Sequence, residues 1–248
     1  MSIESEDDLA ALQRVGYVVA RTLAAMEQAV EPGVTTADLD AVGGSCMRAN
    51  GARSAPQVFY RCPTMTLISV NDEIVHGLPG RRRLRSGDVV KLDVTAELDG
   101  FVADAARTVV VPPGRPASDG LRDAAQTAFA RASASARAGM PVSVIGHEVE
   151  RSVTRSGYSV IRELSGHGIG RAIHEWPNVP NFFDPRQRDV LSEGLVLTIE
   201  PLIAERPCGS IMERDGWTLR TNNGALAAHF EETIVITRGA PWVLTRLP

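Results

Sequence analysis

Cysteine is scarce in this sequence: Cys46, Cys62 and Cys208 are the 3 among 248 residues. Their odd number, wide separation and lack of CxxC spacing argue against a disulfide framework and against a thiolate zinc site. Positive charge is not in excess either, since 26 Lys+Arg against 30 Asp+Glu give a formal net charge of -4. A global positive field that could hold nucleic acid phosphates is therefore missing, so we expect no nucleic acid partner.

Long apolar runs are also missing. No window approaches the roughly 18 consecutive apolar residues that a membrane-spanning helix requires. Residues 1–8 are acidic and lack the basic and apolar regions of a secretory signal. We therefore expect a cytoplasmic protein without a membrane segment. The remaining composition, 44% apolar and 23% charged, is typical of a globular protein, and the length allows one large domain or two small ones.

Hydrophobic periodicity predicts two helices followed by strands, and then the same order again. The first helix is expected to be capped by Ser5 and to stop at Glu31-Pro32-Gly33. The other expected helices cover residues 36–50, 118–138 and 143–155, and the clearest strands cover 67–70 and 89–94. Asp99-Gly100 has the composition of a two-residue hairpin turn.

This order suggests an internal duplication, and polar residues recur at matching places. In each half a carboxylate ends a β-rich run, six residues after a glycine, with a histidine upstream and a second carboxylate downstream. The matched pairs are His76 with His174, Asp93 with Glu200, and Asp104 with Glu231. A purely structural repeat would need to duplicate only its apolar positions. We therefore predict one domain made of two halves, about 1–114 and 115–248, that share a site.

The hairpin turn tests whether Asp93 and Asp104 can act together. If Asp99-Gly100 is the turn, Asp104 lies opposite Thr95. Because Asp93 and Thr95 are two residues apart, both aspartates then project from one face of the sheet as diagonal neighbours. Two buried carboxylates at this distance would share a cation, although an isolated surface pair remains the alternative for the hairpin alone.

His167 adds a nitrogen to the carboxylates. It lies in Ser165-Gly166-His167-Gly168-Ile169-Gly170, where glycines allow close approach of a ligand to the imidazole. The spacing GxGxG is not a dinucleotide fingerprint. Four carboxylates and one imidazole form an oxygen-rich set that suits two divalent ions, Mn, Fe(II), Co or Zn.

Eight runs carry a more specific signal. They are Asn71-Asp72-Glu73-Ile74-Val75-His76-Gly77, Leu92-Asp93-Val94-Thr95, Asp99-Gly100-Phe101, Gly166-His167-Gly168-Ile169-Gly170-Arg171, His174-Glu175-Trp176-Pro177, Thr198-Ile199-Glu200-Pro201, Asp215-Gly216-Trp217-Thr218 and Phe230-Glu231-Glu232-Thr233. In this order they resemble the motifs of the methionine aminopeptidases, from near residue 5 to about residue 245. The resemblance implies the α+β pita-bread fold, with two pseudo-symmetric halves around a dinuclear metal site. It also implies the type I, bacterial-like form, because the sequence shows neither the zinc-binding extension nor the helical insertion of other forms.

The resemblance also implies roles for individual residues. It makes Asp93, Asp104, His167, Glu200 and Glu231 the ligands of two divalent ions. Glu200 would relay a proton from the attacking water, His174 would donate to the substrate carbonyl oxygen, and His76 would hold the scissile nitrogen. The implied reaction is the release of N-terminal methionine from peptides and nascent proteins. Its implied setting is a cytoplasmic monomer, with transient ribosome association left open.

The sequence departs from the family around the pocket for the first residue. Phe59, Cys62 and Trp217 are expected to line this pocket, and Arg61-Cys62-Pro63 replaces a Gly-aromatic-Pro run. Ile173 stands where many relatives have an aromatic residue. These changes concern specificity and leave the expected metal ligands intact.

Two further departures lie beside Glu231. His229 replaces a glutamine that is common in the family and shares the sheet face of Glu231, which allows a hydrogen bond to a ligand. Glu232 replaces a histidine and is expected to point to the opposite face.

Two alternatives to methionine release follow from the same residues. Xaa-Pro peptidases and creatinase-like hydrolases share the fold and the metal ligands, but they carry a separate N-terminal domain. A peptide-binding protein that has lost catalysis would be expected to have lost ligands, whereas all five are present in this sequence.

Overall fold

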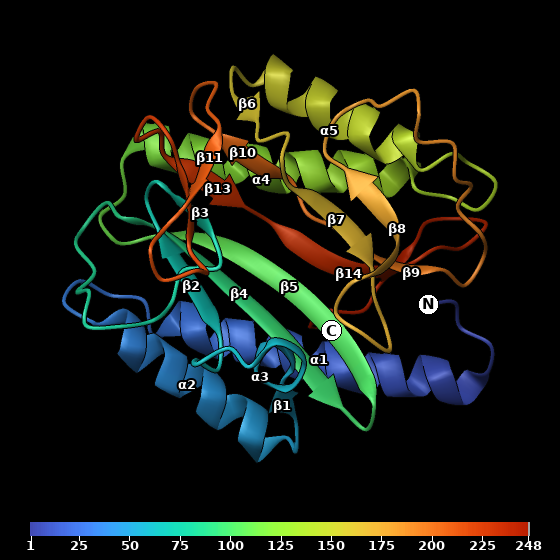
Figure 1. Cartoon of the computed structure of the whole chain (residues 1–248), viewed down its shortest axis with the longest axis horizontal. Coiled ribbons are helices and arrows are strands. Elements are labelled where there is room, and N and C mark those ends of the chain that lie inside the picture. The colour runs from blue at the N-terminus through green and yellow to red at the C-terminus, as the bar shows by residue number, and fades with distance from the viewer. Residues whose placement is uncertain (248) are drawn as a thin grey trace.

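The computed structural model describes residues 1–247 and contains two pairs of long helices with strands between them (Figure 1). The helices are α1 (Glu6–Gln28), α2 (Thr36–Ala49), α3 (Ala55–Tyr60), α4 (Pro116–Ser135) and α5 (Ser143–Arg155). The strands are β1 (Arg53–Ser54), β2 (Leu67–Val70), β3 (Glu73–Val75), β4 (Val89–Leu98), β5 (Phe101–Val110), β6 (Ser159–Val160), β7 (Ser165–Gly168), β8 (Glu175–Pro180), β9 (Val196–Ile199), β10 (Leu202–Ala204), β11 (Ser210–Met212), β12 (Leu219–Thr221), β13 (Ala227–His229), β14 (Glu231–Val235) and β15 (Trp242–Val243). The four long helices expected from the sequence are all present.

Capping residues explain where the first two helices begin. The Ser5 side chain accepts a hydrogen bond from the Asp8 amide (3.1 Å). Thr35 and Asp38 form a capping box, in which each side chain bonds the backbone of the other residue. These contacts satisfy amides that have no partner within the helix, so each helix starts where the chain supplies them.

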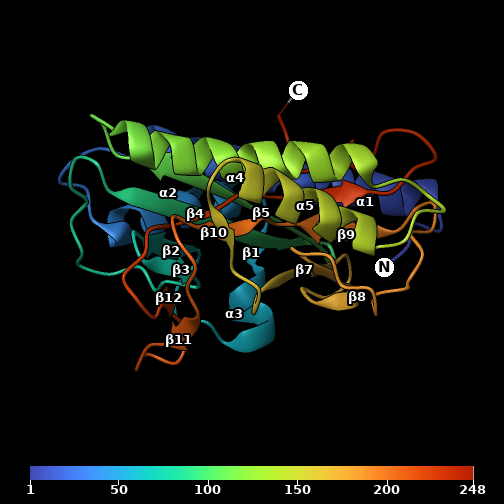
Figure 2. The ribbon, with the colours of Figure 1, turned by 90° about the horizontal axis from the view of Figure 1, so that it is seen from above.

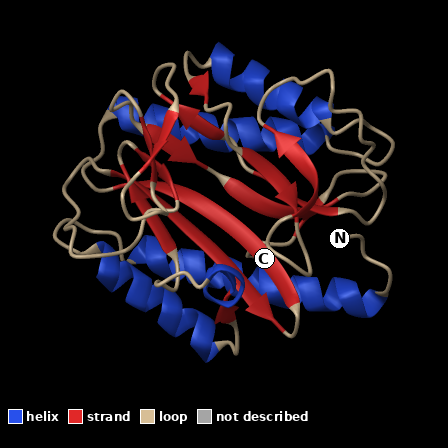
Figure 3. Ribbon diagram, in the orientation of Figure 1, coloured by secondary structure: helices blue, strands red, loops and turns tan. Residues whose placement is uncertain are grey.

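The central sheet has the order β1-β4-β5-β14-β9-β7-β8, with β2 added to β4 and β15 to β14. Two smaller sheets, β13-β10-β6 and β11-β12-β3, lie beside it. Because β5 pairs with β14, strands from the first and second halves of the chain form one continuous sheet. The helix pairs lie at opposite margins of these strands (Figure 3).

Each helix pair packs on its own apolar core. Leu12, Val19 and Met26 of α1 are buried against Val90 and Leu92 of β4 in one cluster. Apolar residues of α4 and α5 form a second cluster with β9 and β14. The view from above shows α1 and α4 along one side of the sheet and α3 on the other side (Figure 2). The sheet face opposite the long helices is therefore not part of these two apolar cores, and polar side chains can gather on it.

The hairpin register agrees with the sequence-based prediction. Leu98 pairs with Phe101, and Asp104 pairs with Thr95, so Asp99-Gly100 forms the turn. Asp99 and Gly100 both have positive φ, 53° and 82°, which explains why Gly fits the second position. Among residues 1–247, no helix is long and apolar enough to cross a membrane.

Candidate metal centre

The hairpin β4–β5 supplies two buried carboxylates. Asp93 is 8% exposed and Asp104 is 6% exposed, and both project from the same face of the sheet. The Asp104 amide donates to Thr233 Oγ1 (2.9 Å), and the Thr233 hydroxyl donates back to the Asp104 carbonyl (2.7 Å). This reciprocal pair fixes Asp104 against β14 of the second half.

The second half adds Glu200 and Glu231. Glu231 begins β14 opposite Ala106 of β5, and Glu200 directly follows β9. The Thr198 hydroxyl donates to Glu200 Oε1 (2.9 Å) and accepts a bond from the His167 amide (3.1 Å). One threonine thus positions both a carboxylate and the imidazole-bearing strand.

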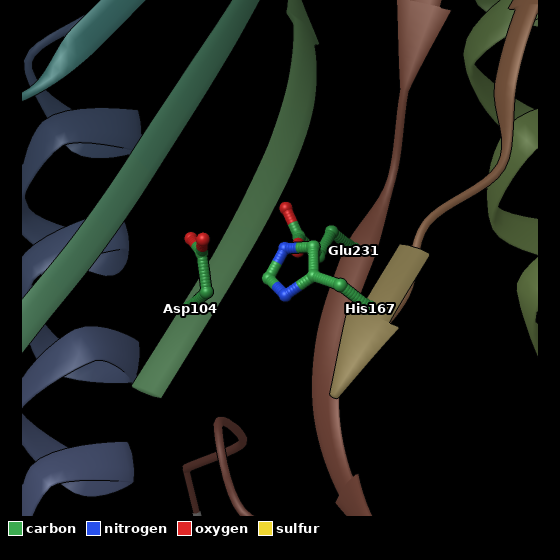
Figure 4. A group of neighbouring side chains, drawn as sticks. All are labelled: Asp104, His167 and Glu231. Carbon is green, nitrogen blue, oxygen red and sulfur yellow. The ribbon is translucent and has the colours of Figure 1, made fainter. Parts of the chain in front are cut away.

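His167 of β7 turns its Nε2 atom toward the carboxylates. Its Nδ1 lies 3.0 Å from the Gly168 carbonyl oxygen, to which it can donate only as N–H. The Nε2 lone pair is then free and lies 3.5 Å from Glu200 Oε1. Asp104, His167 and Glu231 approach one another from three different strands (Figure 4).

Candidate ligand atoms form two groups, with the atoms within each group no more than 4.8 Å apart. One group contains Asp104, His167 and Glu231, and the other contains Glu200, His229 and Glu231. Glu231 is common to both. The two groups contain four of the five residues expected as ligands, Asp104, His167, Glu200 and Glu231, together with His229. Asp93 belongs to neither group, but it lines the same cavity.

The electrostatics of these carboxylates are unfavourable without a cation. Burial, followed by the charges of neighbouring carboxylates, raises the pKa of Asp93, Asp104 and Glu200 well above the usual range. Burial, followed by the charge of Glu232, raises the pKa of Glu231 to about 8. Four such groups close together favour either protons or positive ions as partners.

Unpaired buried atoms point to the same conclusion. Among the described residues, the buried side-chain atoms without a hydrogen-bond partner are Asp93 Oδ1, Asp104 Oδ1, His229 Nδ1 and Nε2, and Glu231 Oε1. All belong to this cluster. Buried polar atoms are paired in the great majority of cases, so a set of orphans in one place indicates a missing ligand. Oxygen atoms with imidazole nitrogen fit a divalent cation of the Mn, Fe(II), Co or Zn type.

Two further histidines border the cluster. His76 has φ = 59°, uncommon for a residue other than glycine, and burial lowers its pKa to about 4. Burial also lowers the pKa of His174, whose ring centroid lies 4.3 Å from that of His167. The Tyr60 hydroxyl lies 2.7 Å from His174 Nδ1. Both histidines can therefore act as neutral hydrogen-bonding groups near neutral pH.

A cavity of about 530 Å³ opens over the cluster and is partly apolar. Trp217, which the sequence analysis placed in the pocket, lines it together with Ile173, Tyr60, Val75 and Leu202. The cavity is far larger than one side chain. It therefore has room for a peptide end, with apolar walls for its first residue.

Two residues expected in the pocket, Phe59 and Cys62, are not among the described residues that line this cavity. On α3, residues four apart share a face, so Pro56 and Tyr60 both line the cavity, whereas Phe59 lies on another side of the helix. Cys62 is buried, and its thiol contacts the Thr64 hydroxyl (3.4 Å).

Tyr60 was missed because the sequence analysis predicted no helix at residues 55–60. The signal was present: Ser54 accepts a bond from the Gln57 amide as an N-cap, and Pro56 follows in the first turn. Glu232 behaves as expected, since it points away from Glu231 and pairs with Arg107 Nη2 (2.7 Å).

Comparison with known proteins adds independent findings. Residues 10–238 match the model of metallopeptidase family M24. The chain is 37% identical over 249 residues to "Methionine aminopeptidase 2" of Bacillus subtilis, with 100% of both chains covered. It is 34% identical over 243 residues to "Methionine aminopeptidase" of Clostridium perfringens, with 98% of each chain covered.

Comparison with solved structures finds proteins of the same kind. A crystal structure of methionine aminopeptidase from Thermotoga maritima has a TM-score of 0.96 and 31% identity, with full coverage of both chains. Prolidase from Pyrococcus furiosus has a TM-score of 0.78 at 22% identity, and the match covers 99% of this chain and 66% of the prolidase. The prolidase likeness concerns the fold alone. The pita-bread fold expected from the sequence is confirmed, and the chain belongs to metallopeptidase family M24.

Proposed function

We propose that this chain is a metal-dependent aminopeptidase that releases N-terminal methionine from peptides and nascent proteins. One observation supports the metal-dependent part above all: the unpaired buried polar atoms of the described chain gather at one cluster, below a cavity. Asp93, Asp104, His167, Glu200 and Glu231 would hold two divalent ions there. Full-length similarity to proteins named methionine aminopeptidase supports the choice of substrate.

Divalent ions at this cluster would supply Lewis acidity, which lowers the pKa of water and polarises a carbonyl group. Glu200 would take the proton of the attacking water, since its carboxylate lines the cavity in which the peptide would bind. Thr198 donates to Glu200 Oε1 and would keep the other oxygen, Oε2, toward the cavity.

His174 and His76 would form hydrogen bonds with the substrate peptide. If the Tyr60 hydroxyl donates to His174 Nδ1, the hydrogen of His174 lies on Nε2. That N–H would donate to the substrate carbonyl oxygen as negative charge develops there. His76 would hold the scissile nitrogen from the other side of the cavity. Each residue thus acts through a preorganised hydrogen bond rather than through a full charge.

The apolar wall would select the first residue. Trp217, Leu202 and Val75 line the cavity, and a thioether side chain packs well against aromatic and aliphatic groups. We propose that the natural substrates are new chains in the cytoplasm and that the enzyme works as a monomer, with transient ribosome association as a further part of the proposal.

A substrate panel tests the function. Met-Ala-Ser is compared with peptides that begin with Leu, Pro or Ala and with an Xaa-Pro peptide, each with added Co, Mn, Fe(II) or Zn. We expect release of Met from Met-Ala-Ser in at least one metal. Failure to release any first residue with any metal would refute the enzyme, and preference for Xaa-Pro would refute the methionine assignment.

A pair of aspartate variants tests the site. Asp104→Asn removes a buried carboxylate of the cluster and is expected to lose bound metal and activity together. Asp7→Asn, an exposed aspartate in the first turn of α1, is the matched control and is expected to keep both. Full activity in Asp104→Asn would exclude the proposed ligand set.

A further inference from the structure

His229 is the one buried histidine of the cluster that the function above does not use. It ends β13 and is 2% exposed. Neither Nδ1 nor Nε2 has a hydrogen-bond partner in the described structure. An imidazole that is enclosed and unpaired on both sides is unusual, because one unpaired buried polar group already costs the free energy of a hydrogen bond.

The backbone holds this imidazole in place. The His229 amide donates to Thr108 Oγ1 (2.9 Å), and the Thr108 hydroxyl donates to the His229 carbonyl (2.8 Å). His229 ends β13 opposite Leu202 of β10, and Glu231 begins β14 two residues later. The ring is therefore directed into the cluster by strands on both sides.

The distances place His229 Nε2 between two carboxylates. It lies 3.4 Å from Glu231 Oε2 and 3.7 Å from Glu200 Oε2. These separations are long for hydrogen bonds, which lie near 2.7–3.2 Å for N–H and oxygen. They do suit donor atoms around a common centre, since ligands about 2.0–2.2 Å from an ion are separated from one another by more than hydrogen-bond distance.

We propose that His229 is a sixth ligand, which binds through Nε2 to the divalent ion shared with Glu200 and Glu231. The proposal rests on the function above for the presence of that ion. Each of the two candidate groups then contains one imidazole, His167 in one and His229 in the other. A neutral imidazole adds a donor without changing the charge balance of four carboxylates against two divalent ions.

A second nitrogen donor has a consequence for metal choice. Imidazole suits Zn, Fe(II) and Co more than Mn, which favours carboxylate and water oxygen. Zinc and cobalt should therefore depend on His229 more than manganese does.

X-ray absorption spectroscopy of the zinc-loaded full chain tests the proposal directly, because imidazole ligands give distinctive multiple scattering. His229→Gln is the main variant, since glutamine can still donate a hydrogen bond to a carboxylate. His229→Asn is a shorter second variant, in case the first does not fold. His147→Gln, at an exposed histidine of α5, is the matched control.

We expect two imidazoles per pair of zinc ions in the wild-type chain and in His147→Gln, and one in either His229 variant. We also expect Zn²⁺ affinity to fall by at least about tenfold in His229→Gln, with a smaller loss for Mn²⁺. One imidazole in the wild-type chain, or equal losses for both metals, would overturn the proposal.

Methionine release by the same samples separates this inference from the proposed function. Wild-type activity with one imidazole would refute His229 as a ligand and leave the aminopeptidase intact. A wild-type chain that binds no metal would refute both.

Discussion

Removing a carboxylate from the cluster should stabilise the metal-free protein. Glu231 is 2% exposed, and burial followed by the charge of Glu232 raises its pKa from 4.5 to about 8. A raised acid pKa means that the folded chain binds its proton more tightly than the unfolded chain does. The stability that this group contributes is therefore complete below pH 4.5 and is lost as the pH rises through about 8.

The size of the effect follows from the two pKa values. A pH of 7 lies about 2.5 units above the unfolded-state pKa of 4.5 and below the folded-state pKa of about 8. Each unit is worth 1.36 kcal/mol, so the folded wild type is destabilised by about 3 kcal/mol at pH 7. At pH 5 the corresponding cost is about 1 kcal/mol. Glutamine carries no titratable proton, so Glu231→Gln avoids both costs.

Thermal unfolding in a chelator measures the difference. For a chain of this size 1 kcal/mol corresponds to about 2–4 °C, so metal-free Glu231→Gln should melt roughly 6–12 °C above the wild type at pH 7. The difference should shrink to about 2–4 °C at pH 5. Glu31→Gln, at an exposed glutamate after α1, is the matched control and should leave the melting temperature unchanged. Adding metal should reverse the order, because only the wild type keeps the full ligand set.

A metal-free Glu231→Gln that melts at or below the wild type at both pH 7 and pH 8 would refute this prediction. Such a result would mean that Glu231 is ionised and paired in the metal-free chain. The predicted pKa near 8 would then be wrong, and so would the interpretation of its unpaired oxygen.

Three other predictions concern the metal and the histidine at the cavity. Chelation should lower the melting temperature of the wild type by about 5–11 °C relative to protein with free metal at 100 times Kd, where bound metal contributes about 2.7 kcal/mol. Identical melting curves with chelator and with metal would exclude a metal site in the folded chain. Between pH 8 and pH 6 the calorimetric affinity for Co²⁺ should fall about fiftyfold in total, because Glu231, with a pKa of about 8, must lose its proton before it binds metal. A flat profile would exclude this competition. Tyr60→Phe removes the hydroxyl beside His174 Nδ1. This variant should lower kcat about tenfold and alter its pH profile, with little change in KM. Unchanged kinetics would show that Tyr60 has no role in the reaction.

The sequence was sufficient for the parts that depend on local periodicity. The register of Asp93 and Asp104 followed from one turn, since alternation in a strand is strict and Asp99-Gly100 admits few turn types. The duplication of carboxylates and histidines predicted that both halves contribute to one site. Both predictions depend only on residues that are near one another in the sequence or on a pattern that the sequence repeats.

Contacts between distant segments could not be predicted in the same way. Tyr60 meets His174 across 114 residues, and that pairing depends on where α3 lies over the sheet. The sequence suggests only a hydrogen bond from His229 to a ligand, because it shows that His229 lies two residues before Glu231 but not that both of its nitrogens have no partner. The resemblance suggests Phe59 as the aromatic residue of the pocket, whereas the turn of α3 places Tyr60 at the cavity.

The arrangement of charges explains why a cation would matter to the fold as well as to the chemistry. Asp93 and Asp104 come from the first half and Glu200 and Glu231 from the second, so their repulsion acts across the seam between β5 and β14. On the opposite face of that seam, Arg107 donates to the Glu231 carbonyl (2.9 Å) and to Glu232 Oε1 (2.7 Å). One face of the seam is therefore already held by an internal cation, while the carboxylates and imidazoles of the cluster gather on the other face. Divalent ions on that face would supply the matching attraction, so metal binding should stabilise the junction of the halves more than either half alone.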